Sequence, residues 1–467
     1  MASCSKAWPG GDRFCDGDRF GRENDQFPET LLLDYSYSRD GVLKGLFFNR
    51  NGWERAKRNP VLFLLVNDPG LKAEAPDNLP HSLDYGDILG GMSTRTDWDL
   101  SATSDAVCSD IRGGGYHFGN HQHSDAGSFQ IFHHGRLLTD IGVYMAYGTP
   151  YDFNFYKRSI SHNTVLVKDP DEPLAPRTKQ NDGGCRFNQQ TPTSPEETRR
   201  DPRFNYGKVL SVAFSPDSLN PDFSYFKAEL GPAYSEKIKS YKRRYCFMDL
   251  KQDKIPAAVI ISDDITINGD FPCYWKVNSL TSPENTAFGI RVSNSLEGLK
   301  GNAYITDISP ESTRHKFEIS NVRDSSSVLG PQYQIRYPSP DASAYQIVEY
   351  SEDNARKQQF LNLVQVTEGE EKPLEWKCEK GEGIYTVTIS DRIVCLSENA
   401  ESVSAPFAFE VSGNFSEYKV SLNDLLPGNW EVTNQENGES RNFKVSDRNN
   451  SIYFKAIPGK YKVVFVG

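Results

Sequence analysis

The alternation of apolar and polar residues that begins after Pro76 is the feature that most limits what this chain can fold into. Apolar side chains recur at every second position in short runs, for example over 209–214, 239–247 and 384–389. Such a run places one set of side chains on one face of a strand. Turn residues separate the runs, and the pattern recurs up to about residue 398. It therefore predicts a large antiparallel β-sandwich, a mainly β fold.

The expected strands are short, and most are bounded by turn residues. The chain has 23 tyrosines and 27 phenylalanines, which favour strands, and 36 glycines and 27 prolines, which favour turns. Residues 169–203 are polar and proline-rich, so a long loop over the surface is expected there. The strands expected from the pattern lie at 128–132, 164–167, 209–214, 225–230, 239–247, 257–262, 345–350, 360–366 and 384–389.

Composition changes along the 467 residues indicate more than one domain. The N-terminal part has two short apolar runs and, between them, a helical pattern over 51–60 that is expected to end at its proline. These helices are too few to bury a core alone. A second change near 397–401 separates a small β unit. The expected organisation is a helical segment over 1–75, a central sandwich over 76–398 and a small β domain over 399–467.

Charge and hydropathy narrow the function classes. The net charge of −11 disfavours a nucleic-acid binder, although a local basic cleft can still hold a polyanion. Mean hydropathy is −0.60, and no apolar run approaches the roughly 18 residues that span a membrane, so no membrane span is expected. The first residues lack the apolar core of a secretory signal. The eight cysteines form no CxxC pair, which argues against a thiolate zinc site.

A histidine cluster carries the chemistry. Seven of the eight histidines precede residue 163, and His121 and His123 lie two apart in one short segment. On a strand they would face the same side, whereas in a loop they can diverge. Asp140 follows an expected hairpin turn at Gly135 that returns it towards His123, and His162 opens the next strand. Two imidazoles and one carboxylate fit one zinc ion.

Two other interpretations of the cluster stay open. The histidines can be hydrogen-bonded groups of the sandwich with no metal. A cupin barrel is the other alternative, but it needs a glutamate a few residues after the histidine pair, and the nearby acid is Asp125.

Three phrases at this cluster resemble those of the heparinase II/III-like polysaccharide lyases, a group that also includes oligoalginate lyases. The phrases cover 121–129, 135–144 and 156–165, and Arg95-Thr96-Asp97-Trp98 is similar to the entry to the family's sandwich. The resemblance implies an α/α toroid, a central β-sandwich and a small C-terminal β domain. Here only a short remnant of the toroid is expected before Pro76.

The resemblance also implies roles for individual residues. His123, Asp140 and His162 would bind one structural zinc ion, and His121 would lie on the catalytic face. A tyrosine between the second and third metal ligands would line the cleft, and both Tyr147 and Tyr151 qualify. A positive neighbour would lower the pKa of that tyrosine, and Arg158, with Lys157 beside it, is expected to supply this charge and to bind substrate.

The implied activity is β-elimination on a uronic-acid-containing polysaccharide, either a glycosaminoglycan such as heparin or heparan sulfate, or alginate. The partner would be the acidic polysaccharide or an oligosaccharide of it, with a homodimer as a further expectation. Relatives are exported to the periplasm, but this chain shows no export signal. The alternatives are a non-catalytic, zinc-stabilised carbohydrate-binding sandwich and a fragment of a larger lyase.

Overall fold

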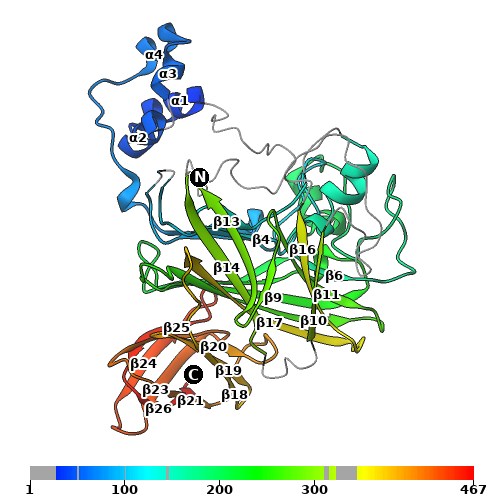
Figure 1. Cartoon of the computed structure of the whole chain (residues 1–467), viewed down its shortest axis with the longest axis vertical. Coiled ribbons are helices and arrows are strands. Elements are labelled where there is room, and N and C mark those ends of the chain that lie inside the picture. Colours follow the sequence, from blue (N-terminus) through cyan, green and yellow to red (C-terminus); the bar gives the residue numbers. More distant parts are fainter. Residues whose placement is uncertain are drawn as a thin grey trace.

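The computed structural model describes residues 28–49, 52–99, 101, 103–142, 147–309, 315–321 and 344–467. Its centre is one antiparallel sheet of eight strands (Figure 1). Both faces of this sheet are buried, because apolar side chains from neighbouring layers cover each of them. The strands run in the order β12 (Glu284–Thr286), β13 (Gly289–Leu296), β14 (Leu299–Asp307), β17 (Lys357–Glu368), β10 (Ala257–Ile267), β9 (Ile238–Asp249), β8 (Phe223–Glu229) and β7 (Lys208–Ser215).

Two smaller antiparallel sheets cover one face of the central sheet. Their side chains, among them Phe129 and Trp275, share one apolar core with Val259 of the central sheet. This packing confirms the predicted antiparallel β-sandwich. One sheet contains β1 (Ser82–Asp84), β2 (Gly91–Arg95), β3 (Cys108–Arg112), β4 (Phe129–Phe132) and β5 (Arg136–Leu138); the other contains β15 (His315–Asn321), β16 (Tyr345–Ser351), β11 (Cys273–Ser279) and β6 (Val165–Val167).

Two further sheets form the C-terminal region. Strand β20 shows how this region is placed, because its alternate residues face two cores. Ile393 faces the core of the C-terminal region, and Val394 faces the central sheet. The first sheet runs β18 (Trp376–Gly381), β19 (Ile384–Ile389), β20 (Arg392–Ser397), β22 (Tyr418–Leu422) and β25 (Ile452–Ala456); the second runs β21 (Phe407–Val411), β26 (Gly459–Phe465), β23 (Gly428–Asn434) and β24 (Ser440–Val445).

The C-terminal region therefore starts in space before the composition change near residue 399. Strands β18, β19 and β20 precede that position, yet they share a sheet with β22 and β25, which follow it. The pairing of β20 with β22 is parallel and carries the sheet across residue 399. The composition change thus falls at a connection inside this region, where exposed polar residues follow β20.

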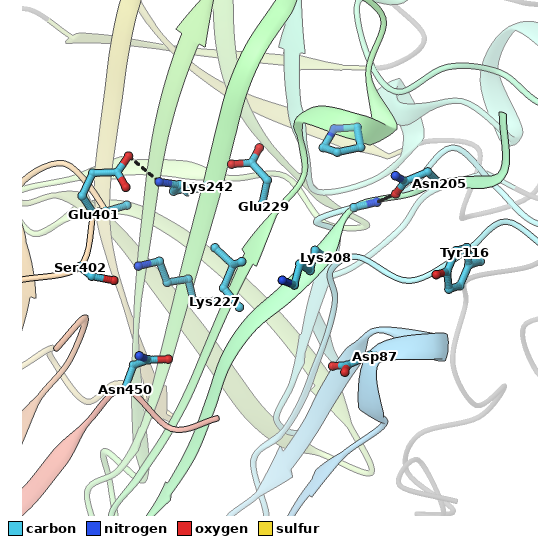
Figure 2. Close-up of a pocket in the computed structure, with 14 residues that line it drawn as sticks. Asp87, Tyr116, Asn205, Lys208, Lys227, Glu229, Lys242, Glu401, Ser402 and Asn450 are labelled. Atoms are coloured by element: carbon cyan, nitrogen blue, oxygen red, sulfur yellow. Dashed lines mark hydrogen bonds and ion pairs between the residues drawn. The ribbon is translucent and has the colours of Figure 1, made fainter. Parts of the chain in front are cut away.

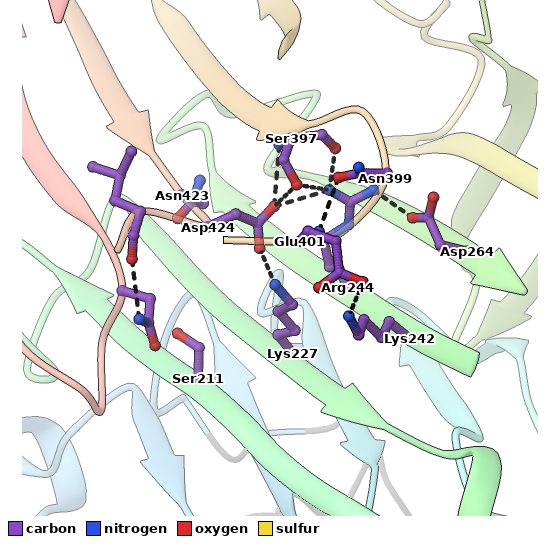
Figure 3. A network of polar contacts seen from close by, with 12 residues as sticks. Ser211, Lys227, Lys242, Arg244, Asp264, Ser397, Asn399, Glu401, Asn423 and Asp424 are labelled. Carbon is purple, nitrogen blue, oxygen red and sulfur yellow. Dashed lines mark hydrogen bonds and ion pairs between the residues drawn. The ribbon is translucent and has the colours of Figure 1, made fainter. Parts of the chain in front are cut away.

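A buried polar network fastens the C-terminal region to the central sheet (Figure 3). Asp424 accepts hydrogen bonds from Lys227 at 2.6 Å and from Arg244 at 2.9 Å, and Tyr225 donates a third at 2.8 Å. Burial raises the pKa of Asp424, but these two cations outweigh it and hold the pKa well below its usual range. Because Ser397 also donates to Asp424, one carboxylate ties strands of both regions together.

The N-terminal helices pack mainly on one another. Leu32, Tyr35 and Phe47 form their small core, and Trp98 joins them to the start of the sandwich. Figure 1 shows this group standing apart from the central sheet. The helices are α1 (Pro28–Ser38), α2 (Gly41–Asn49), α3 (Gly52–Ala56) and α4 (Pro60–Val66).

The prediction that a helix over 51–60 ends at its proline is wrong in one respect. Helix α3 ends at Ala56, and Pro60 begins α4 instead of stopping a helix. The side chain of Asn59 accepts a hydrogen bond from the backbone nitrogen of Leu62 and caps this helix. Proline suits the first helical position because the N–H that it lacks has no partner within the helix there.

All nine predicted strands overlap strands of the structure.

The remaining helical elements are single turns in connections. Within the described residues, no helix is long and apolar enough to cross a membrane. The single-turn elements are η1 (Pro76–Asn78), α5 (Gly86–Leu89), η2 (Asp152–Tyr156), η3 (Ser159–Ser161), α6 (Pro195–Arg200), η4 (Pro202–Phe204) and η5 (Gly231–Ala233).

Candidate functional site

The His121–His123 segment is a turn between β3 and β4, and its two histidines diverge. His121 is exposed, whereas His123 is buried. Gln122 holds the turn, because its side chain accepts from the backbone nitrogen of Phe118 at 2.8 Å and donates to the carbonyl oxygen of Tyr116 at 3.2 Å. The segment thus presents one imidazole outward and keeps the next one inside the protein.

The structure brings His123, His162 and Asp140 together. Nδ1 of His123 lies 3.1 Å from Nε2 of His162, and Nδ1 of His162 lies 2.9 Å from a carboxylate oxygen of Asp140. All three side chains are buried. His162 uses its two ring nitrogens for the two contacts, so the three groups form a chain with this imidazole in the middle.

Hairpin geometry and hydrogen bonds explain why distant residues meet here. Strands β4 and β5 pair antiparallel across the turn at Gly135, as the sequence predicts, and this returns Asp140 to the start of β4. Ser128 donates to the other oxygen of Asp140 at 3.0 Å and accepts from the backbone nitrogen of Asn163 at 3.2 Å. The segment that precedes β6 is therefore tied to the same point.

Lys276 of β11 lies on the buried side of this row of three side chains. Its ammonium group donates to the carbonyl oxygen of His162 and, at 3.0 Å, to the side chain of Asn278. Complete burial lowers the pKa of Lys276 to about 7, although Asp140 acts in the opposite direction. This lysine has no signal in the sequence, because it lies more than a hundred residues after the motif.

The residue types fit a zinc ion, but in this structure His162 turns one ring nitrogen to His123 and the other to Asp140, so the three donor atoms do not meet at one point. Two imidazoles and one carboxylate are the groups that zinc accepts, and their burial protects a bound ion from solvent. Asp125 lies close by but pairs with Arg112 at 3.0 Å, and its backbone oxygen accepts from Ser128 in a turn. The zinc site with His123, Asp140 and His162 as ligands stays a prediction.

The two candidate tyrosines lie in different surroundings. Tyr147 is 42% exposed, and its ring centre lies 6.2 Å from that of His121. Asn120 donates to its hydroxyl group at 3.3 Å. Tyr151 is 5% exposed and packs among the rings of Phe155 and Tyr156 in a core cluster. Only Tyr147 therefore shares the exposed surface with His121.

The two basic residues beside the third phrase also differ. Nζ of Lys157 lies 4.6 Å from the ring centre of Tyr147, so this lysine places a positive charge beside that tyrosine. Arg158 is buried, and its guanidinium group donates to Asp182 at 2.8 Å. A carboxylate 24 residues further along thus pairs with the guanidinium group of Arg158, and the substrate-binding role of Arg158 stays a prediction.

An arginine of the long 169–203 segment lies beside Tyr147. Arg177 is exposed, and its guanidinium carbon lies 5.9 Å from the ring centre of that tyrosine. It donates to the carbonyl oxygen of Gly148 at 3.0 Å, which holds it in place. The sequence gives no sign of this contact, since a proline-rich loop does not reveal where it will fold back.

A cavity of about 760 Å³ lies where the central sheet meets the C-terminal region (Figure 2). Three lysines line it, but two of them are engaged. Lys242 pairs with Glu401 at 2.5 Å and Lys227 pairs with Asp424 at 2.6 Å. Asp87, Glu229 and Glu401 also line the cavity, so its acidic side chains equal its lysines in number. This cavity does not fit a polyanion as well as the exposed surface at His121 does.

Comparisons with known proteins indicate which protein family this chain is similar to. Residues 108–198 match a family model described as heparinase II/III-like, C-terminal, and residues 378–464 match one described as heparinase II C-terminal domain. The chain is therefore heparinase II/III-like in these two regions, which confirms the resemblance. The first region contains every candidate residue from His121 to Arg177. A relation to oligoalginate lyases stays a prediction.

Solved structures of heparinases are similar to this chain at low sequence identity. Heparan sulfate lyase HepC from Pedobacter heparinus is 14% identical, with a TM-score of 0.44, over 75% of this chain and 47% of that one. A heparinase III with methylated lysines is 13% identical, with a TM-score of 0.47, over 95% of this chain and 50% of that one. The chain spans about half the length of these proteins. No curated protein sequence matches.

Proposed function

We propose that this chain provides the sandwich half of the active site of a polysaccharide lyase, acting by β-elimination on a uronic-acid-containing polysaccharide. The substrate class is a glycosaminoglycan such as heparin or heparan sulfate, with alginate as the other uronic-acid polymer. The observation that carries the proposal is the pairing of an exposed imidazole, His121, with a phenol, Tyr147, beside a buried cation.

The chemistry needs a base and an acid on one surface. We assign His121 to remove the proton at C5 of the uronic acid, because a neutral imidazole accepts a proton near pH 7. The electron pair of that C–H bond then forms the C4–C5 double bond, and the bond from C4 to the leaving oxygen breaks. Tyr147 donates its phenolic proton to that oxygen, and the ammonium group of Lys157 stabilises the phenolate that remains.

The substrate carboxylate must be neutralised before the C5 proton becomes acidic. Arg177 suits this role, because its guanidinium group is exposed and lies next to Tyr147. It replaces Arg158, whose guanidinium group is bound to Asp182. Guanidinium binds a carboxylate through two parallel hydrogen bonds, which also orients the sugar.

The proposed zinc ion has a supporting role. His123, Asp140 and His162 would hold it, and it would supply a fixed positive charge that locks these buried side chains. Because His123 follows His121 by two residues, a locked His123 also fixes the turn that presents His121.

The experiment compares the chain with its His121→Ala variant on heparin, heparan sulfate, chondroitin sulfate, hyaluronan and alginate. Formation of the unsaturated product is followed by its ultraviolet absorbance. We expect product from at least one polymer, and a loss of at least about a hundredfold in the variant. Equal rates in the two proteins would contradict the role of His121.

A non-catalytic, carbohydrate-binding sandwich is the second candidate. Its basis is that the exposed side chains of His121 and Arg177 can bind an acidic sugar without any reaction taking place. Binding of a polysaccharide without any unsaturated product, measured in the same samples, would select this second function.

A further inference from the structure

A second histidine–carboxylate cluster lies far from His121 in the sequence and joins two sheets of the sandwich. Asp307 ends β14 of the central sheet, while His315 and Glu349 belong to β15 and β16 of the four-stranded sheet. The three side chains are 6%, 9% and 0% exposed. One donor atom from each lies within 4.8 Å of the other two.

Both carboxylates face the same nitrogen. Nδ1 of His315 lies 3.0 Å from an oxygen of Asp307 and 2.8 Å from Oε1 of Glu349. A ring nitrogen carries at most one proton, so it cannot serve two acceptors equally. Among the described residues, Oε1 of Glu349 is buried without a hydrogen-bond partner of suitable geometry. The cluster therefore has more acceptors than donors.

The remaining oxygen of each carboxylate is held from outside. The backbone nitrogen of Ser309 donates to Oδ1 of Asp307 at 2.8 Å. Nδ2 of Asn362, on β17, donates to Oε2 of Glu349 at 2.6 Å. Each carboxylate is thus fixed by one oxygen and turns the other towards the shared centre. This is how outer hydrogen bonds orient the ligands of a metal ion.

We propose that Asp307, His315 and Glu349 bind a divalent cation of the Mn²⁺ class, distinct from the zinc site at His123. Metal bonds of about 2.1 Å at right angles place neighbouring donors about 3.0 Å apart, whereas tetrahedral bonds place them about 3.4 Å apart. The separations from Nδ1 to the two carboxylate oxygens, 3.0 and 2.8 Å, match the first case and equally match hydrogen bonds from a protonated imidazole. One imidazole with two carboxylates is also a harder donor set than two imidazoles with one carboxylate, which favours Mn²⁺.

A bound cation would act as a staple between the sheets. The cluster's two carboxylates and a neutral imidazole carry a charge of −2, which a divalent ion balances. Without metal, a proton on His315 takes its place: burial lowers the pKa of His315, but hydrogen bonds to Asp307 and Glu349 raise it to about 10. The metal-free cluster is therefore a competing account that the experiment must separate.

The experiment uses the full chain, stripped with a chelator and then given one equivalent of zinc for the first site. Mn²⁺ is titrated into the parent and into Glu349→Gln, and bound Mn²⁺ is measured by electron paramagnetic resonance. Glu349→Gln is expected to fold, because it leaves His315 paired with Asp307. We expect one equivalent bound to the parent and at least a tenfold weaker affinity in the variant.

Two controls locate the ion. Glu352→Gln removes an exposed carboxylate just after β16 that pairs with Lys316, so it should leave Mn²⁺ affinity unchanged. His123→Ala should also keep the Mn²⁺ ion, because it alters only the other cluster. Absence of bound Mn²⁺ in the parent, or equal affinity in the parent and Glu349→Gln, overturns the proposal. Should Glu349→Gln fail to fold, nitrogen modulation of the Mn²⁺ signal in His123→Ala supports imidazole coordination, and its absence overturns it.

Discussion

The two histidine–carboxylate clusters use the same residue types in opposite ways. In the cluster at His123, the imidazole of His162 lies between its two partners. It turns Nε2 towards His123 and Nδ1 towards Asp140. At His315, both carboxylates meet one nitrogen. The first cluster lies beneath an exposed turn that carries His121, whereas the second lies between two sheets. Residue type therefore sets which chemistry is available, and the backbone decides whether it supports a surface or joins two layers.

The largest expected effect separates the two clusters by activity. Tyr147→Phe removes the phenolic proton beside the first cluster and should lower the rate of product formation by about 10²- to 10⁴-fold. Its melting temperature should stay near that of the parent, because the side chain is 42% exposed. Tyr151→Phe is the matched control, since this ring is buried in a core cluster, whereas His121 is exposed. A larger loss of rate in the control would reverse the assignment.

The next effect tests the second cluster through stability. In the metal-free protein, His315→Gln leaves Asp307 and Glu349 buried without a cation, which should cost about 3–5 kcal/mol of unfolding free energy. Glu349→Gln should cost much less, because one cation and one anion remain. Urea unfolding of both variants measures the difference. Similar midpoints would show that the charge of His315 does not hold this cluster together.

Removal of zinc tests the first cluster, and its effect is also measured as a change in unfolding free energy. With free zinc at about a hundred times its dissociation constant, the parent should gain roughly 2.7 kcal/mol relative to the chelated protein. His123→Ala should lose that gain, while His133→Ala, which changes a buried histidine outside both clusters, should keep it. Thermal melts with and without zinc report the gain, and a zinc-dependent shift in His123→Ala would count against the ligand assignment.

The smallest effect concerns a histidine that belongs to neither cluster. Burial lowers the pKa of His117 to about 3, with Arg112 acting in the same direction. The unfolded chain therefore binds this proton first, and stability should fall by about 1.4 kcal/mol per pH unit as the pH drops below about 6.5. In His117→Phe, the slope of the unfolding free energy against pH should be smaller by the contribution of this one proton. Urea midpoints between pH 7 and pH 5 measure it, and an unchanged slope would contradict the neutral, buried state.

The sequence predicts the first cluster because its residues lie within one run of strands and turns. The hairpin at Gly135 follows from local turn chemistry, and strand pairing across it determines where Asp140 returns. Those contacts span fewer than forty residues. The sequence did not show which of Tyr147 and Tyr151 shares the surface with His121, because both lie in an irregular segment whose packing depends on neighbouring loops.

The residues that the sequence did not reveal are those whose partners lie in an irregular loop or on another sheet. The pairing of Arg158 with Asp182 is one example, because Asp182 lies in the loop over 169–203 and folds back onto it. Arg177 reaches Tyr147 from the same loop. His315 is the one histidine after residue 163, and nothing near it in the sequence marks it as a ligand.

The sequence by itself determined the strands, the antiparallel sandwich and the His123 cluster, because alternation and turn residues act over a few positions. The tertiary structure decided which side chains share a surface. It placed β14 of one sheet against β15 and β16 of another, and it joined β18–β20 to strands beyond residue 399. Such pairings depend on how whole sheets stack to bury their apolar faces, and no local pattern encodes the partner of a sheet.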